Sequence, residues 1–297
     1  MTHFTIRVRL CLLAAACPTF AAAQTTTLTA DRILDGRGAI VTNTVVVVEG
    51  SRITRLGGLP TGTVYDLTGF TLLPGGIDTH SHINWHFDPD GKTHHLSREE
   101  ESTAEAVMYA AENAYVTLMS GITTTQSLGS RIDKPLRDAI ARGTVPGPRV
   151  LTSLGSIGER TGSPDEIREA VRRFAADGAD VIKIFASASI RVGGTPTLSQ
   201  EQLDAACGEA RVHGLRTAVH AHGPESAQRA VLAGCTVIEH GALLDDVTLD
   251  MMAKHGTFYD PNIGLIFSNY FDNKDHYIGI GNYTEEGFGQ MERAVPT

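Results

Sequence analysis

The chain has 297 residues, 41% of them hydrophobic, and its 34 acidic residues outnumber the 25 basic ones to give a formal net charge of −9. A chain of this length can bury one large core and carry a small additional domain. An acidic surface repels a phosphate backbone, so the composition argues against the nucleic-acid-binding classes and we expect no nucleic-acid partner.

The first 23 residues follow the order of charged, apolar and small residues that is typical of a secretory signal. Arg7 and Arg9 precede the apolar run 10–17, and three alanines close the segment. This run is much shorter than the ~20 residues that span a bilayer, and no other stretch is a candidate membrane span. We predict a signal peptide over 1–23 and a secreted or periplasmic protein. A lipoprotein acylated at Cys17 is the minor alternative.

Removal of this signal leaves 23 basic and 34 acidic residues, a formal charge of −11. It also removes Cys11 and Cys17, so that two of the four cysteines remain. Cys207 lies in a helical pattern and Cys235 just before an apolar strand, positions where single thiols are usually small buried hydrophobes. We therefore predict no disulfide framework.

The segment 24–70 is rich in β-branched residues and interrupted by Asp-Gly, Glu-Gly and Gly-Gly pairs, which predicts short strands joined by turns. Its clearest strand is 44–48. From residue 71 onward, short apolar runs alternate with amphipathic helices, the pattern of repeated βα units with a parallel sheet. We predict a small β-rich domain over 24–70 and an α/β domain over 71–297.

Local signals mark the helices of the second domain. Ser163 with Glu166, and Ser199 with Gln202, have the spacing of capping boxes. Helical stretches also end at glycines, which can adopt the positive φ angle that a helix end favours. These are Gly121, Gly178, Gly214, Gly234 and Gly256.

Seven strands follow from these boundaries, at 73–82, 122–126, 149–154, 180–185, 215–220, 236–240 and 257–261. A closed barrel of alternating strands and helices has eight. We therefore predict an α/β (β/α)8 TIM barrel that lacks its last strand, and we interpret the chain as truncated before the eighth strand.

Two histidines end the first barrel strand. Residues two apart face the same side of a strand, so the side chains of His80 and His82 form a chelating pair. The alternative is a pair of loop histidines without chemistry. The strand follows a Pro-Gly-Gly turn, and its C-terminal end is where active sites of this fold are built, which favours a metal site.

Lys183 lies in an almost wholly apolar strand, although an unpartnered ammonium is costly to bury. Three interpretations follow: an edge strand that exposes the lysine, a Schiff-base lysine, or a lysine carboxylated by carbon dioxide to a carbamate that bridges two cations. The next two strands end in His220 and His240. A satisfied core histidine would explain one such residue but not the whole series, so the histidines favour the carbamate.

The order of His-x-His, strand lysine, histidine and histidine resembles the amidohydrolase superfamily, in the imidazolonepropionase-related branch that includes Xaa-Pro dipeptidases. Flanking residues extend the likeness: Leu-Pro-Gly-Gly-Ile-Asp-Thr-His up to His80, Gly-Ile-Thr-Thr-Thr from Gly121, Gly-Ala-Asp-Val-Ile-Lys up to Lys183, and Ile-Glu-His-Gly around His240. The resemblance runs from about Leu28 to the last residue.

The resemblance implies two divalent metal ions held by five side chains. His80 and His82 hold the first ion, His220 and His240 hold the second, and carboxylated Lys183 bridges them. His222 shares the side of its segment with His220 and is then expected near the substrate. Zinc is the default metal, while manganese, cobalt and iron also suit these ligands.

The family pattern also has a catalytic aspartate at the end of the eighth strand. Asp245 and Asp246 begin a helix, and Asp260 lies on the seventh strand, where it is a poor match for that role. We therefore expect the catalytic aspartate beyond Thr297, and we leave open whether this chain is active without it.

The resemblance predicts a metal-dependent hydrolase that cleaves a C–N bond of a small-molecule amide or peptide with a metal-activated bridging hydroxide. Xaa-Pro dipeptides and N-acyl amino acids are the suggested substrates. The mononuclear deaminases of the superfamily lack the strand lysine, which argues against them. Alternatives are a lactonase or phosphotriesterase-like hydrolase, and an inactive or incomplete metal-binding fragment. An oligomer is compatible with the sequence.

Overall fold

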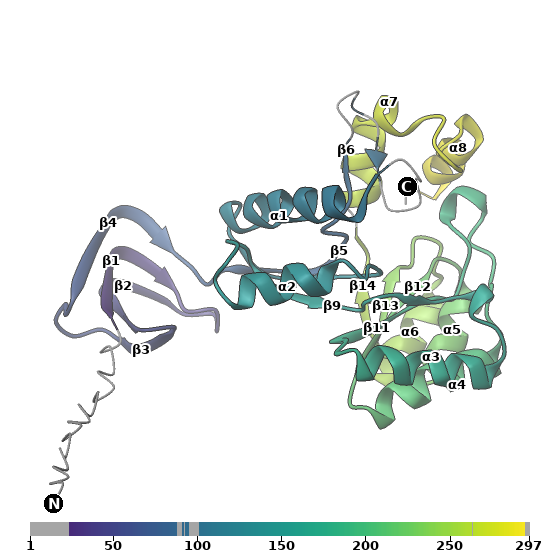
Figure 1. Ribbon diagram of the computed structural model, residues 1–297, viewed down its shortest axis with the longest axis horizontal. Coiled ribbons are helices and arrows are strands. Elements are labelled where there is room, and N and C mark those ends of the chain that lie inside the picture. The colour runs from purple at the N-terminus through teal and green to yellow at the C-terminus, as the bar shows by residue number, and fades with distance from the viewer. Residues whose placement is uncertain (1–23, 88–90, 92, 95–100, 263, 295–297) are drawn as a thin grey trace, which may run out of the picture. The chain divides into compact units, whose positions relative to one another are not determined.

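A computed structural model describes residues 24–87, 91, 93–94, 101–262 and 264–294 (Figure 1). The signal predicted over 1–23, including Cys17, lies outside these residues. The chain forms two compact units, one up to Pro74 and the other from Gly75. Among the described helices, none combines the length and the apolar character that a membrane crossing requires.

The first unit is a four-stranded sheet in the order β3-β2-β1-β4. Its strands are β1 (Thr25–Leu34), β2 (Ile40–Glu49), β3 (Arg52–Leu56) and β4 (Thr63–Leu72). β1 pairs antiparallel with β2 and parallel with β4. Ala30, Ile33 and Val46 form its small buried core. The strand expected at 44–48 is part of β2.

The second unit contains two parallel sheets, in the orders β5-β8-β9 and β10-β11-β12-β13-β14. The strands are β5 (Gly76–Ser81), β8 (Ile122–Ser127), β9 (Arg149–Thr152), β10 (Ser156–Ile157), β11 (Val181–Phe185), β12 (Arg216–Ala221), β13 (Val237–His240) and β14 (Phe258–Asp260). A separate hairpin pairs β6 (His86–Phe87) with β7 (Thr93–His94). All seven predicted strands are present.

A bend joins the two parallel sheets. β9 pairs with β8, and β10 pairs with β11. Between them Leu154 adopts a φ of 57°, which few non-glycine residues do. The predicted strand 149–154 therefore ends early, at Thr152, and the chain enters the other sheet beyond the predicted range, as β10.

The helices also match the sequence signals. They are α1 (Thr103–Met119), α2 (Asp133–Ala141), α3 (Pro164–Ala176), α4 (Gln200–Val212), α5 (Pro224–Leu232), α6 (Asp246–His255), α7 (Lys274–Tyr277) and α8 (Glu285–Arg293), with short helical turns at Glu159–Thr161, Ile190–Val192 and Leu265–Tyr270. Both predicted capping boxes form, at Ser163 and at Ser199. The five glycines expected at helix ends all have positive φ angles.

Alternation along the strands separates two faces. Ile182, Ile184 and Val219 belong to the largest apolar core, which they share with α3 to α6, the helices drawn next to β11–β13 in Figure 1. Val181 and Ala218 occupy the other alternate positions of the same strands and pack into a separate small cluster. Side chains at these alternate positions therefore point away from the helices. This face of the sheet carries the candidate site.

Apart from the hairpin of β6 and β7, the strands of the two parallel sheets lie in chain order from β5 to β14. Thr79 of the first strand donates a hydrogen bond of 2.5 Å to Asp260 of the last. The α/β class with parallel sheets is confirmed. Closure of these strands into a barrel stays a prediction, because no backbone pairing of β14 with β5 occurs among the described residues.

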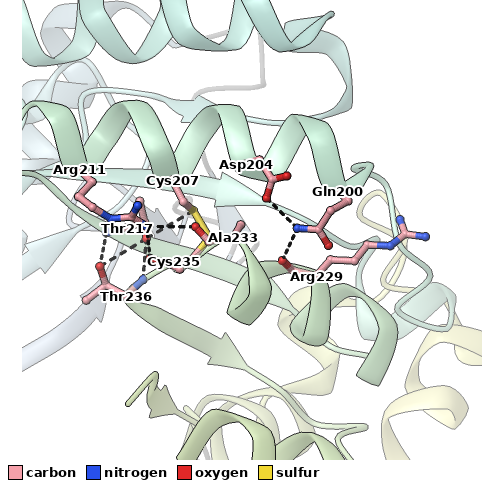
Figure 2. The surroundings of a disulfide bond; sticks show 10 residues. Gln200, Asp204, Cys207, Arg211, Thr217, Arg229, Ala233, Cys235 and Thr236 are labelled. Carbon is pink, nitrogen blue, oxygen red and sulfur yellow. Dashed lines mark hydrogen bonds between the residues drawn. A yellow bond between two sulfur atoms is a disulfide. The ribbon is translucent and has the colours of Figure 1, made fainter. Parts of the chain in front are cut away.

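The expectation that the chain has no disulfide is wrong, because Cys207 and Cys235 are bonded to each other (Figure 2). Both cysteines are buried, as expected. They are 28 residues apart in sequence, but their Cα atoms lie 5.2 Å apart where α4 passes the start of β13. The two predicted environments were correct, and it is the packing of α4 against the sheet that brings the thiols together.

Asp133, the first residue of α2, is fully buried. Its Oδ2 accepts a hydrogen bond of 3.0 Å from the Thr152 hydroxyl, while Oδ1 has no partner among the described residues. Burial raises the pKa of this carboxyl from 3.8 to about 6, against the opposing effect of its hydrogen bonds. The folded protein therefore favours the neutral acid.

A pH dependence of stability follows. Because the pKa of Asp133 is raised in the folded protein, the contribution of this carboxyl to the free energy of unfolding is complete below about pH 4. It is lost as pH rises through about 6, a change of about 3 kcal/mol. Asp133→Asn, which stays neutral, should gain that amount relative to wild type between pH 4 and pH 8 in urea unfolding. Asp250→Asn, on an exposed position of α6, is the control. A constant difference between D133N and wild type would contradict the prediction.

Candidate metal centre

The structure brings the five predicted ligands together at the C-terminal ends of their strands. The ring centroids of His80 lie 5.3 Å from His82 and 4.8 Å from His240. The rings of His220 and His240 are 4.7 Å apart. Lys183 reaches the same cluster, with Nζ 3.4 Å from Nε2 of His80. Four strands far apart in sequence therefore contribute to one group of side chains.

Lys183 is buried on an inner strand of its sheet. It is 1% exposed, and its strand β11 has a paired neighbour on each side. The interpretation of an edge strand that exposes the lysine is therefore wrong. Its ammonium lies 5.2 Å from the ring centroid of Phe185. Burial lowers the pKa of Lys183, while the nearby Glu239 opposes this shift. A lowered pKa increases the fraction of neutral, nucleophilic amine.

His240 reaches the cluster through an unusual backbone conformation. Strict alternation would point its side chain to the same face as Ile238, which lies in the helix-covered core. Instead His240 has a φ of 70°, and its ring contacts His80 and His220. The positive φ therefore lets two consecutive residues, Glu239 and His240, both reach the cluster.

His222 lies against the same cluster and is 4% exposed. Its ring centroid is 4.6 Å from that of His220 and 5.1 Å from that of His240. Its backbone N–H donates to the Ser187 hydroxyl, but its Nδ1 has no hydrogen-bond partner among the described residues. A buried nitrogen with no partner is expensive, unless a ligand binds it.

Burial makes the histidines of the cluster neutral. It lowers the pKa of His80, His220 and His240 well below the usual value and that of His222 to about 3. The charge of Lys183 adds to each of these shifts. Neutral imidazoles offer lone pairs, which is the form that binds metal ions.

Glu239 is a member of the cluster that the sequence analysis missed. Its Oε2 lies 2.7 Å from Nδ1 of His80, and the residue is 1% exposed. Burial raises the pKa of this carboxyl, while the nearby Lys183 opposes the shift. A charged residue in an apolar strand was the signal that identified Lys183, and the same signal would have identified Glu239.

The aspartates are placed as expected. Asp245 caps α6, and Asp246 is its first helical residue. Asp260 ends β14, where its Oδ1 accepts a hydrogen bond of 3.0 Å from Asn262 and its Oδ2 one from Thr79. Both carboxylate oxygens of Asp260 thus have protein partners, which supports leaving Asp260 out of the proposed set of metal ligands.

Among the described residues, no group of three or more histidine, cysteine, aspartate or glutamate side chains is arranged to hold a metal ion. The donors nevertheless fit one chemically. They are imidazoles, at least four of them held neutral by burial, that converge with a buried lysine, and one buried nitrogen of His222 has no other partner among the described residues. Nitrogen donors of this kind, with a carboxylate-like bridge, suit zinc and similar divalent ions.

Aromatic residues border the cluster. Trp85 stacks on His82 with ring centroids 4.0 Å apart. A cavity of about 610 Å³ is lined by Trp85, His86, Phe87, Tyr109, Glu112, Asn113, Asn269 and Tyr277. Trp85 and Phe87 are 40% and 48% exposed, which is high for such large apolar side chains. A mostly aromatic cavity next to a polar cluster is a usual form of a ligand site.

Comparisons with known proteins agree with this arrangement. Ochratoxinase of Aspergillus niger is 26% identical over 230 residues, which cover 63% of this chain and 47% of that protein. A solved Xaa-Pro dipeptidase with bound methionine in its active site has a TM-score of 0.78 and 28% identity, with 91% of this chain and 74% of that chain covered. A solved putative prolidase from Bifidobacterium longum has a TM-score of 0.73 and 26% identity, with coverages of 92% and 69%.

The chain spans about half the length of the curated relatives it matches. The model of the amidohydrolase family matches residues 71–276, a range that includes the whole histidine and lysine cluster. This match covers more than half of the chain and coincides with the strands that carry the cluster. The chain therefore belongs to the amidohydrolase family.

Proposed function

We propose that this protein is a metal-dependent amidohydrolase with a binuclear centre at His80, His82, Lys183, His220 and His240. The observation that carries this proposal is the convergence of these side chains at the ends of β5, β11, β12 and β13. Two bound divalent ions would lower the pKa of a bridging water and polarise the carbonyl of the substrate.

The protein side chains have separate tasks in this proposal. The four imidazoles supply lone pairs, and those of His80, His220 and His240 need no proton loss at neutral pH, because burial already holds them neutral. The neutral amine of Lys183 adds to carbon dioxide, an N–C bond forms, and one proton leaves to solvent. The resulting carbamate carries the negative charge that a bridging ligand needs. His222 lies beside the ligands, where its Nδ1 can contact the substrate.

We propose an amide or peptide-like C–N bond as the target, in an Xaa-Pro dipeptide or an N-acyl amino acid. Support comes from the named activities of the similar proteins, a Xaa-Pro dipeptidase and a putative prolidase among them. The aromatic cavity that Trp85 shares suits a substrate with an apolar group next to the scissile bond.

A substrate panel tests this function. Purified protein reconstituted with zinc or manganese is assayed for amine release from Xaa-Pro dipeptides and N-acyl amino acids, beside a matched lactone and a phosphotriester. We expect hydrolysis of at least one amide, loss of that activity with a chelator, and its return with metal. Turnover of the lactone or phosphotriester alone would assign the site to those hydrolases, and metal binding without any turnover would support the inert alternative.

We also propose that the protein is exported. The support is the disulfide between Cys207 and Cys235, because such bonds persist in oxidising compartments. Cell fractionation with mass spectrometry of the N-terminus should find the protein outside the cytoplasm, beginning at Gln24. A cytoplasmic protein with an intact N-terminus would contradict export, and an acylated Cys17 would identify the lipoprotein.

A further inference from the structure

Glu239 makes a specific contact with one of the proposed ligands. Its Oε2 lies 2.7 Å from Nδ1 of His80, and the side chains of both residues are almost fully buried, at 1% and 3% exposed. A buried carboxylate costs free energy unless it has hydrogen-bond partners or an opposite charge. The contact with His80 therefore accounts for a charged residue that packing alone would exclude.

The two nitrogens of His80 face different neighbours. Nδ1 faces Glu239, while Nε2 lies 3.4 Å from Nζ of Lys183. While it is ionised, the Glu239 carboxylate can only accept at Nδ1, so the proton of a neutral imidazole is held there. The lone pair is then left on Nε2, toward Lys183 and the rest of the cluster. A water partner at Nδ1 would leave the choice between the two tautomers open.

The strand holds Glu239 rigidly in this position. Glu239 pairs in register with His220 of β12 on one side and with Asp260 of β14 on the other. The preceding residue, Ile238, is anchored in the core that the helices cover. The carboxylate is therefore fixed by backbone pairing on both sides, which a residue on a loop would lack.

We propose that Glu239 is a positioning residue that accepts the Nδ1 proton of His80 and so presents Nε2 of His80 as a metal-binding lone pair. The metal part of this statement rests on the proposed function. The tautomer of His80 does not, because it is a property of the metal-free protein. Carboxylate partners of this kind typically change metal affinity by 10 to 100-fold.

Two variants and two measurements test the proposal. Glu239→Gln keeps the shape and leaves a weaker acceptor, while Glu239→Met has nearly the same length and no acceptor. Nitrogen-15 NMR of metal-free protein reports the tautomer of His80, with the signal assigned by comparison with His80→Gln. Competition with a zinc chelator reports the affinity of each zinc ion. Asp133→Asn is the matched control, because it removes another buried carboxylate of the same unit, one whose Oδ2 accepts from Thr152 and not from a residue of the cluster.

We expect neutral His80 to carry its proton on Nδ1 in wild type and mainly on Nε2 in E239M. In E239Q we expect a mixture of these two tautomers. The affinity for one zinc ion should fall by about 10 to 100-fold, more in E239M than in E239Q, with D133N unchanged. If E239M does not fold, the E239Q comparison decides. A wild-type tautomer and wild-type zinc affinity in E239Q would overturn the proposal. If wild type binds no metal, the proposed function fails, and the tautomer of His80 still decides the role of Glu239.

Discussion

Lys183→Met should abolish tight metal binding while the protein still folds. Methionine fills nearly the same volume in this 1% exposed position but has no amine that could form a carbamate. Loss of a bridging ligand should weaken metal binding by more than about 100-fold, beyond the effect of losing a partner outside the ligand set. Metal content after dialysis, measured by plasma mass spectrometry, should fall from about two ions per chain to well below one.

Lys183→Ala provides the complementary test. The truncated side chain leaves space next to His80, and a small carboxylate such as acetate should enter it and restore part of the metal content. Lys183→Met offers no such space and should not respond to acetate. Removal of carbon dioxide from the buffer during reconstitution should lower metal uptake of wild type alone. Wild-type metal content in K183M would exclude the carbamate bridge.

The double variant Cys207→Ala/Cys235→Ala should lower the free energy of unfolding by about 3 to 4 kcal/mol. The disulfide closes a loop between residues 28 apart, and the loss of its constraint on the unfolded chain has this size in the chain-entropy model. In a unit of this size the midpoint of thermal unfolding should fall by about 10 °C. Calorimetry of the oxidised protein and of the double variant measures the difference.

Reduced wild-type protein is the control for packing. The two buried alanines lose a little apolar contact, so the reduced protein should lie between the oxidised protein and the double variant. The hydrogen bonds between Thr217 and Thr236 seen in Figure 2 should remain in all three forms and hold β12 and β13 in register. Equal unfolding midpoints of oxidised and reduced protein would mean that the bond contributes nothing.

Local signals were sufficient to predict the order of the elements. Glycines with a free choice of φ end the helices, and serine capping boxes begin two of them, because these effects depend on neighbours within four residues. The early end of the strand before Leu154 was not predictable. It depends on which sheet β9 and β10 each pair with, and the residue type of Leu154 gives no sign of a positive φ.

In the candidate site, too, the sequence predicted single residues but not the contacts between distant elements. His80, His220 and His240 were predicted because each stands at or near the end of a strand, and Lys183 because it is a charged residue within an apolar strand. The contact of His80 with Glu239 joins residues 159 positions apart, and the bond between Cys207 and Cys235 depends on how α4 packs. Strand patterns show which residues share a face of one element. They do not show which side chain of another element each residue meets.

Because His240 has a positive φ, the residue that best serves stability at this position differs from the residue that best serves metal binding. A left-handed conformation costs a non-glycine residue about 1 to 3 kcal/mol, and glycine would remove that cost. Selection for heat resistance alone would thus favour glycine or asparagine at residue 240, at the expense of the imidazole. Screens that report only folding would enrich such variants, whereas screens for metal-dependent turnover would reject them. The residue recovered at position 240 would therefore tell the two kinds of selection apart.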